Sequence, residues 1–343
     1  MGKGYSRALL CGALVASLVS LPAAAGTLST DVVFTDTTPL SSNLELARRL
    51  LSPLTEAQLP ALVAKSGKAL AEQPIDLAQE KFVVFVPATK PAAGYGLLVF
   101  VPPWDAQKVP EEWNDVLDAA GIIFVAAANS GNDANPIGRR EPLALLAYAN
   151  IAKRYPVDPA RVYVGGFSGG SRIAMRLALG YPDVFRGALL NSGSDPIGDR
   201  IIPIPPRDLF ARFQESSRLA YVTGADDTTV LQADRASRHA MSDWCVFNVE
   251  DREMRGTGHH SADSSSFSWA LDSLAKPASS DSAALAQCRA GIDAALAEKN
   301  RALDALVADG KQDAARALLT EIDQHYGGLA APHSVDLATR LAR

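Results

Sequence analysis

Cysteine is scarce in this chain, at three of 343 residues, and basic side chains do not outnumber acidic ones. The 33 Lys and Arg against 38 Asp and Glu give a net charge of −5, which argues against a nucleic-acid partner because such a partner favours a basic face. Beyond the first 25 residues no apolar run approaches the length of a bilayer span, so no membrane span is predicted. No internal repeat stands out, and no cluster of Cys, His and Glu indicates a metal site. We therefore predict neither a metal nor a cofactor.

The N-terminus has the pattern of a signal peptide. Lys3 and Arg7 precede an apolar run over residues 8–21, and the alanines at 23–25 form a small-residue cleavage site before Gly26. We therefore expect residues 1–25 to be removed. The mature protein is then exported and acts in the periplasm or outside the cell.

Two cysteines, Cys245 and Cys288, remain once the segment that contains Cys11 is removed. An even number of cysteines in an oxidising compartment permits a disulfide, which would tie the C-terminal residues to the domain before them. Two buried free thiols are the alternative. The sequence leaves both open, because the distance between the two residues is not visible in it.

The rest of the chain has the composition of a globular protein, with 48% apolar and 21% charged residues. From residue 81 to 274, apolar strand-like segments alternate with helical ones, which predicts an α/β fold with a mostly parallel, doubly wound sheet. We divide the chain into a lead-in with short helices over 26–80, an α/β domain over 81–276 and a helical appendage over 277–343.

Some segments are less regular. Residues 27–43 are polar and are predicted to be a loose lead-in, and residues 192–213 are predicted to be a loop rich in isoleucine and proline. Residues 245–254 are predicted to be the last strand.

One pattern carries chemical information, because Gly166, Ser168 and Gly170 spell G-x-S-x-G between a short apolar strand and the helical stretch 171–180. This is the spacing of a nucleophile elbow, in which a sharp strand-to-helix turn projects a serine hydroxyl clear of the sheet. Side chains two residues before and after the serine would collide with neighbouring backbone, so glycine suits both positions. Ser168 is therefore the candidate nucleophile.

A serine nucleophile needs a histidine to accept its proton and a carboxylate to orient that histidine. The carboxylate is expected just after the strand over 219–223, where Asp226 and Asp227 are adjacent. The histidine is expected on the loop after the last strand, where His259 and His260 are adjacent. Position alone leaves both pairs open, with one aspartate for catalysis and the other for the turn into the next helix.

Two backbone N–H groups are expected to stabilise the oxyanion that forms when the serine attacks. Gly169, which follows the candidate nucleophile, supplies the first, and the loop after the strand over 97–101 supplies the second. That loop begins with Pro102 and Pro103, which have no N–H. Trp104 is the first residue in it that is able to donate.

The chain from about 81 to 274 resembles the secreted α/β-hydrolase esterases of the polyhydroxybutyrate depolymerase and feruloyl esterase type. The resembling stretches are 155–188 (YPVDPARVYVGGFSGGSRIAMRLALGYPDVFRGA), 224–230 (GADDTTV) and 256–259 (GTGH). The resemblance implies an α/β-hydrolase fold. It also selects Asp227, three residues after the glycine and three before the valine, as the acid, and His259, directly after G-x-G, as the base. Asp226 and His260 are the second choices.

The chain departs from this family at the loop that completes the oxyanion site. Members usually carry His-Gly at its entrance, where this sequence has Pro102-Pro103. The departure concerns the second oxyanion donor and leaves the nucleophile, base and acid in place.

These patterns predict a serine hydrolase that cleaves a small-molecule or polymeric ester through an acyl-enzyme intermediate. A serine peptidase uses the same three residues and is an alternative, although the roughly 55 residues between leader and first strand are too few for the large extra domain such enzymes often carry. A non-catalytic binding protein on the same fold is a third interpretation.

Two further segments have alternative interpretations. The loop over 192–213 forms either an apolar wall for the acyl group or a cover for the edge of the sheet. Helices are predicted over 282–308 and 313–325, with a turn at Asp309-Gly310 between them. We interpret this hairpin as a structural appendage, and the recruitment of a protein partner is the alternative.

Overall fold

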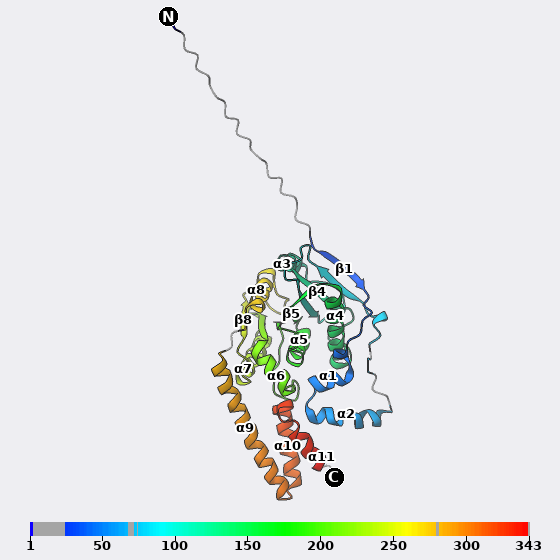
Figure 1. Cartoon of the computed structure of the whole chain (residues 1–343), viewed down its shortest axis with the longest axis vertical. Coiled ribbons are helices and arrows are strands. Elements are labelled where there is room, and N and C mark those ends of the chain that lie inside the picture. Colours follow the sequence, from blue (N-terminus) through cyan, green and yellow to red (C-terminus); the bar gives the residue numbers. More distant parts are fainter. Residues whose placement is uncertain (3–24, 68–71, 74, 279–280, 342–343) are drawn as a thin grey trace.

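An eight-stranded sheet forms the centre of the computed structural model, which describes residues 1–2, 25–67, 72–73, 75–278 and 281–341 (Figure 1). The strands are β1 (Thr27–Val32), β2 (Phe82–Val86), β3 (Tyr95–Val101), β4 (Ile122–Ala127), β5 (Val157–Phe167), β6 (Gly187–Asn191), β7 (Arg218–Gly224) and β8 (Val249–Met254). Their order is β1-β2-β4-β3-β5-β6-β7-β8, and β2 is antiparallel to both of its neighbours whereas the other pairs are parallel. The protein has the α/β-hydrolase fold, as predicted.

Helices cover both faces of the sheet. They are α1 (Asn43–Leu50), α2 (Pro53–Ser66), α3 (Asn114–Ala120), α4 (Glu141–Arg154), α5 (Gly169–Gly180), α6 (Arg207–Ser216), α7 (Thr228–Asp243), α8 (Ser264–Ala275), α9 (Ser282–Ala308), α10 (Gln312–Tyr326) and α11 (His333–Leu341). The helices α3 and α8 share one core with the sheet, and α4, α5 and α6 share the other. The sheet is therefore doubly wound.

Strand β3 shows why the central strands are apolar throughout. Leu97, Val99 and Val101 belong to the core under α4 and α5, whereas Leu98 and Phe100 belong to the core under α3 and α8. Successive side chains of a strand point to opposite faces, and here both faces are buried. The parallel strands end at one edge of the sheet, where ligands bind in open α/β folds.

The prediction of a loose lead-in over 27–43 is wrong for its first residues, because Thr27–Val32 forms β1 at the edge of the sheet. All of its side chains are exposed except Val32, which is half-buried. An edge strand pairs through its backbone, so its side chains need no apolar alternation. The polar sequence TLSTDV therefore gave no strand signal.

Two other boundaries differ from the prediction. Residues 207–213 of the expected loop belong to α6, whose apolar side chains pack into the core, so the loop is confined to 192–206. Strand β8 begins at Val249 rather than at 245. Cys245 has a φ of +62°, which an extended strand does not allow.

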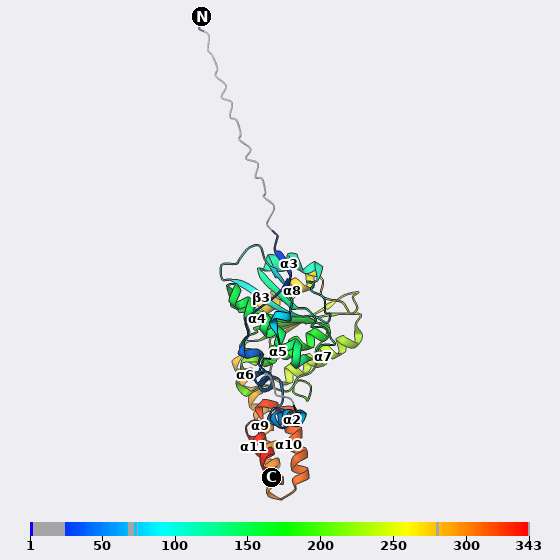
Figure 2. The same cartoon turned by 90° about the vertical axis from the view of Figure 1, so that its right-hand side faces the viewer.

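The described residues of the C-terminal segment form three α-helices rather than two. The helices α9 and α10 form the predicted hairpin, whose turn at Asp309-Gly310 places Gly310 at a φ of +71°. The unpredicted α11 packs against α10 and α2. Figures 1 and 2 show this group at one end of the molecule, beside α2. Its buried Leu303, Leu319 and Leu337 continue the core under α4 and α5, so the group is an integral part of the packing.

Two links tie the C-terminal helices to the rest of the chain. The carboxylate of Asp323 in α10 accepts hydrogen bonds from Ser52 Oγ at 2.5 Å and from the Leu54 N–H at 3.0 Å, at the start of α2. A carboxylate at a helix N-terminus also complements the helix dipole. The second link is a disulfide between Cys245, just after α7, and Cys288 in α9, whose Cα atoms are 5.9 Å apart.

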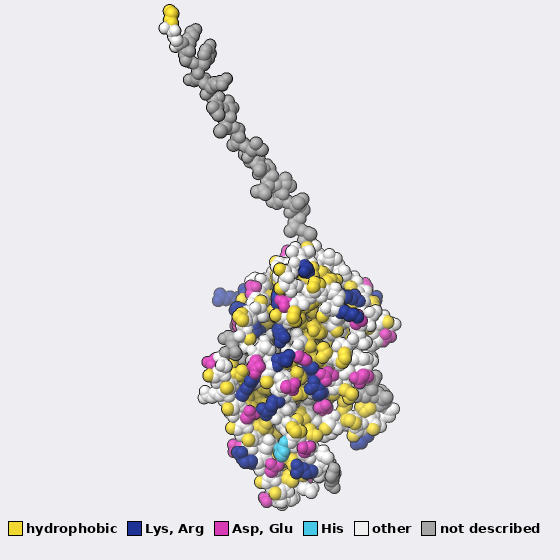
Figure 3. Space-filling view, in the orientation of Figure 1, with side chains coloured by type: hydrophobic (Ala, Val, Ile, Leu, Met, Phe, Trp, Pro, Cys, Tyr) yellow, Lys and Arg dark blue, Asp and Glu magenta, His cyan; other side chains and the backbone are white. Residues whose placement is uncertain are grey.

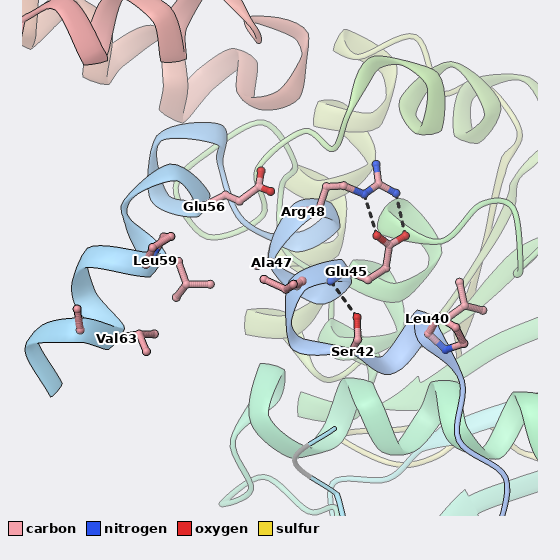
Figure 4. A pocket seen from close by; sticks show the side chains of 12 residues that line it. Leu40, Ser42, Glu45, Ala47, Arg48, Glu56, Leu59 and Val63 are labelled. Atoms are coloured by element: carbon pink, nitrogen blue, oxygen red, sulfur yellow. Dashed lines mark hydrogen bonds and ion pairs between the residues drawn. The ribbon is translucent and has the colours of Figure 1, made fainter. Parts of the chain in front are cut away.

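A groove of about 940 Å³ lies between α1 and α2 (Figure 4). Leu59 and Val63 of α2 line one wall, and Ala47 of α1 lines the other. Glu45 and Arg48, which form an ion pair at 2.8 Å, lie at its rim. The groove shares no lining residue with the cavity described below.

Acidic and basic side chains are intermixed over the face of the molecule seen in Figure 3. Among the described residues, no helix is both long and apolar enough to span a bilayer. Of the predicted signal segment over 1–25, residues 3–24 lie outside the described residues.

Candidate active site

Ser168 forms the turn between β5 and α5 in a backbone conformation that few residues adopt. Its φ is +54° and its ψ is −123°. Its N–H donates to the Asn191 carbonyl at 2.9 Å, and its own carbonyl accepts from the Ser171 N–H at 3.0 Å. The neighbouring strand and the first turn of α5 therefore hold the strained residue in place, as is common where strain serves a function.

The glycines around Ser168 are required by lack of space. A Cβ atom on Gly166 would lie 2.3 Å from the carbonyl group of Gly170, and a Cβ on Gly170 would lie 1.9 Å from the Val101 carbonyl oxygen. Gly193 belongs to the same crowded turn, because a Cβ there would lie 2.4 Å from the Ser168 carbonyl oxygen. This is the crowding that the G-x-S-x-G pattern predicts.

His259 and Asp227 extend a chain of hydrogen bonds from Ser168. His259 Nε2 lies 2.8 Å from Ser168 Oγ, and His259 Nδ1 lies 2.5 Å from Asp227 Oδ2. The Asp227 side chain is 13% exposed and that of His259 is 44% exposed. Asp227 is the N-cap residue of α7, yet its carboxylate caps no backbone N–H there. This is the arrangement in which a carboxylate can orient an imidazole and the imidazole can take a serine proton.

The loops that carry the acid and the histidine are in direct backbone contact. A Cβ on Gly224, at the end of β7, would lie 2.0 Å from the Gly258 carbonyl oxygen. The Asp226 N–H donates to the Thr257 carbonyl at 3.0 Å. These contacts fix the distance between the two loops, and therefore the hydrogen bond between their side chains.

Asn191 attaches the histidine loop to a second strand end. It is fully buried at the end of β6, and its Oδ1 accepts from the Ala262 N–H at 2.7 Å. The indole N–H of Trp113 donates to the Ala262 carbonyl, also at 2.7 Å. The ring of Phe167 lies 5.0 Å from the His259 ring and supports it from the elbow side.

Asp226 and His260 take no part in this chain of hydrogen bonds among the described residues. Both are exposed, and His260 lines a neighbouring cavity. Within the described part of the chain, no group of three or more His, Cys, Asp or Glu could hold a metal ion. From each adjacent pair, the family resemblance selects the residue that the structure places at Ser168.

Ser168 and His259 line a cavity of about 610 Å³. Its aliphatic lining consists of Ile137, Ile173, Ile201 and Val230. The isoleucines of the loop over 192–206 lie in two different places. Ile201 is 58% exposed and lines this cavity, whereas Ile202 and Ile204 are buried in the core. One segment of the loop thus faces the cavity, and the rest covers the sheet.

The two predicted oxyanion donors lie in different surroundings. Gly169 is the first residue of α5 and lines the cavity with Ser168. The side chain of Trp104 lines the neighbouring cavity, which has a volume of about 1030 Å³. Its ring packs against Phe100 and Phe167, and the Lys108 ammonium lies 4.4 Å from the ring centre.

Arg140 is a residue of the site that the sequence did not reveal. Its side chain is 4% exposed and donates to three backbone carbonyls, those of Pro102 at 2.9 Å, Ser130 at 3.0 Å and Gly169 at 3.4 Å. It therefore joins the loops after β3 and β4 to the elbow. Burial lowers the pKa of the Arg140 guanidinium. Nothing in the sequence distinguishes Arg140 from the adjacent Arg139, which lies nearer the surface.

Asn132, on the loop after β4, is the second such residue and lines the cavity with Ser168. Its amide lies against Gly169, since a Cβ there would lie 2.2 Å from Asn132 Oδ1 and 3.2 Å from Nδ2. A signal was available, because the loop follows a central parallel strand and such loops collect ligands.

Neither the family models nor the curated proteins compared with this chain match it. Solved structures match distantly. A ferulic acid esterase is 19% identical with a TM-score of 0.40, over 57% of this chain and 89% of that one. An S-formylglutathione hydrolase from Staphylococcus aureus is 11% identical with a TM-score of 0.45, over 57% and 93%. A candidate dipeptidyl aminopeptidase IV from Bacteroides ovatus is 15% identical with a TM-score of 0.40, over 56% of this chain and only 33% of that one.

Proposed function

We propose that this protein is an exported serine esterase in which Ser168 is the nucleophile, His259 the general base and Asp227 the acid that orients the histidine. The supporting observation is the unbroken chain of hydrogen bonds from Ser168 Oγ to the Asp227 carboxylate, at a strained strand-to-helix turn. A binding protein on this fold has no need of a strained serine in contact with a histidine–carboxylate pair.

The proposed reaction proceeds in two halves. Ser168 Oγ attacks the carbonyl carbon of the ester, its proton passes to His259 Nε2, and the π electrons of the carbonyl move onto oxygen. The oxyanion then re-forms the carbonyl and expels the alcohol oxygen, which takes the proton from His259. Water repeats these steps on the acyl-enzyme, with His259 again accepting and returning one proton. The products are a carboxylic acid, an alcohol and free Ser168.

The cavity supports an ester with an apolar acyl group, because four aliphatic side chains line it beside Ser168. His259 is 44% exposed, so the reacting groups are also accessible to a large or polymeric ester. The depolymerase and feruloyl esterase type is proposed on the sequence resemblance alone. Export is proposed on the N-terminal pattern, and the disulfide between Cys245 and Cys288 is compatible with an oxidising compartment.

The test compares p-nitrophenyl esters of increasing acyl length with aminoacyl-anilides, using wild type and Ser168→Ala. We expect ester hydrolysis that depends on Ser168. Hydrolysis of anilides alone would favour a peptidase, and the absence of any Ser168-dependent turnover would favour a binding protein. For export, N-terminal sequencing of the secreted protein should begin at Gly26.

A further inference from the structure

The oxyanion site has one donor whose position follows directly from the elbow. The Gly169 N–H lies at the start of α5, where backbone N–H groups have no partner within the helix and the helix dipole favours negative charge. A tetrahedral intermediate carries a full negative charge on its oxygen and is usually held by at least two donors. A second donor must therefore come from another loop.

The loop after β3 is poorly suited to supply it. Pro102 and Pro103 have no N–H, and their carbonyl oxygens accept hydrogen bonds from Arg140 and from the Asn132 N–H, at 2.9 Å and 3.1 Å. None of residues 102–105 is among the described residues that line the Ser168 cavity. Trp104, the next residue of the loop, places its ring in the neighbouring cavity.

Asn132 lies in the Ser168 cavity, beside the residue that carries the first donor. Its side chain is exposed in the cavity that Ser168, Gly169 and His259 line. Its amide lies against the Cα of Gly169, the residue whose N–H is the first donor. The amide has no hydrogen-bond partner among the residues that the structure describes, so Nδ2 is available to a ligand. A half turn about Cβ–Cγ exchanges the oxygen and the nitrogen, which brings Nδ2 to the side of Gly169.

Short contacts hold the loop that carries Asn132. The Gly131 N–H donates to Asp105 Oδ1 at 2.9 Å, and the Asn132 N–H donates to the Pro103 carbonyl at 3.1 Å. Arg140 donates hydrogen bonds to the carbonyls of Ser130 and Gly169, and so connects this loop to the elbow. A donor must be pre-positioned to stabilise charge as it develops, and these contacts supply that positioning.

We propose that the Asn132 side-chain amide is the second oxyanion donor, in place of a backbone N–H from the loop that begins with two prolines. The proposal rests on the proposed function, because it concerns the oxyanion formed by the attack of Ser168. Nδ2 donates one hydrogen bond to that oxyanion and Gly169 donates the other. Arg140 acts as a positioning residue for both loops.

The first test is Asn132→Ala on a p-nitrophenyl ester. Loss of one oxyanion donor lowers kcat by about 10²–10³-fold in enzymes of this kind, with KM nearly unchanged, because the interaction forms only in the transition state. Asn132→Asp has the same shape and offers only acceptors to an anion, so we expect at least the same loss. Asp133→Ala changes the adjacent exposed residue of the loop and serves as the control that keeps wild-type kcat.

A thionoester separates a lost donor from a disturbed loop. Sulfur accepts hydrogen bonds weakly, so the thiono substrate gains little from the Asn132 amide. We expect Asn132→Ala to lower the rate on the oxygen ester by about 10²–10³-fold and to change the rate on the matching thionoester far less. Equal losses on both substrates would mean that the variant disturbs the site in general, and would overturn the proposal.

The outcomes distinguish this proposal from the proposed function. Turnover that depends on Ser168 but stays at the wild-type level in folded Asn132→Ala and Asn132→Asp overturns the role of Asn132 and leaves the esterase in place. Turnover that does not depend on Ser168 overturns both. If Asn132→Ala fails to fold, the Asn132→Asp variant decides, with thermal unfolding as the check on its fold.

Discussion

Around Ser168 the backbone segments approach so closely that a Cβ at Gly166 or Gly170 would meet neighbouring backbone, whereas a Cβ at Gly291 in α9 would meet no atom within 4 Å outside the backbone of its own helix. The helix α9 has 27 residues, of which only Leu285, Leu296 and Leu303 are buried. The turn holds reacting atoms, and a small displacement there changes the reaction. The C-terminal helices need only one apolar stripe. Substitutions in the turn should therefore alter chemistry, and those in α9–α11 should alter stability.

The largest effect that tests this contrast concerns the acid. Asp227→Asn should lower kcat by about 10⁴-fold, because an amide holds the histidine in the wrong tautomer. Asp226→Asn, one residue away and exposed, should leave kcat close to the wild-type value. Steady-state hydrolysis of a p-nitrophenyl ester measures both. Equal losses in the two variants would show that the hydrogen bond from His259 to Asp227 does not carry the function.

The next effect is on stability and lies in the C-terminal helices. Replacement of Cys245 and Cys288 by serine opens a link across 43 residues and should lower the free energy of unfolding by about 2–4 kcal/mol. The kcat of the folded variant should stay near that of wild type, because neither residue touches the Ser168 cavity. Denaturant unfolding without reductant and kinetics at low temperature are the two measurements. A large loss of kcat in the folded variant would contradict the expectation that changes in the C-terminal helices alter stability alone.

A pair of glycine substitutions sharpens the contrast further. Gly166→Ala should lower the free energy of unfolding by about 1–3 kcal/mol and reduce kcat, because the added carbon meets backbone that must shift. Gly291→Ala should raise the free energy of unfolding by about 0.5–1 kcal/mol, because alanine favours a helix interior and its side chain has room. Urea unfolding of both variants measures the change in the free energy of unfolding. A change of the same sign in both would contradict the contrast between the turn at Ser168 and α9.

The smallest expected effect lies in α1, at the groove of Figure 4. Hydrogen bonds from Arg48, and then from Arg49, hold the pKa of Glu45 at about 2, below its ordinary value of 4.5. A depressed carboxyl pKa stabilises the fold above the unfolded value, and this contribution is lost as the pH falls from about 4.5 through about 2. Glu45→Gln should therefore be about 1 kcal/mol less stable at pH 7.

The matching measurement is denaturant unfolding of wild type and Glu45→Gln over the same pH series. The difference between them should shrink on acidification. A difference that stays constant down to pH 2 would show that the ion pairs do not supply it.

The sequence predicted best those elements whose residues are buried on both sides. The strands expected over 97–101 and 219–223 lie within β3 and β7, and the helical stretch 171–180 lies within α5. The polar β1 was missed because an edge strand is specified by backbone pairing. The helix α11 was missed because it packs against α2, a segment that is far away in the sequence, as well as against the preceding α10.

The residues of the candidate site also differ in how well the sequence predicts them. Ser168 follows from a local turn pattern, whereas Asp227 and His259 needed the family resemblance to separate each from its neighbour. The places of Asn132 and Arg140 depend on how the loops after β3 and β4 meet the elbow. That arrangement follows from the adjacency of β3, β4 and β5 in the sheet, and no short motif records it.

The central claim is that Ser168 is a nucleophile activated by His259. A fluorophosphonate probe, followed by mass-spectrometric mapping of the modified peptide, tests it most directly. We predict one adduct, on Ser168, that is absent in Ser168→Ala and forms far more slowly in His259→Ala. An unmodified wild-type protein, or an adduct confined to another residue, would contradict the account.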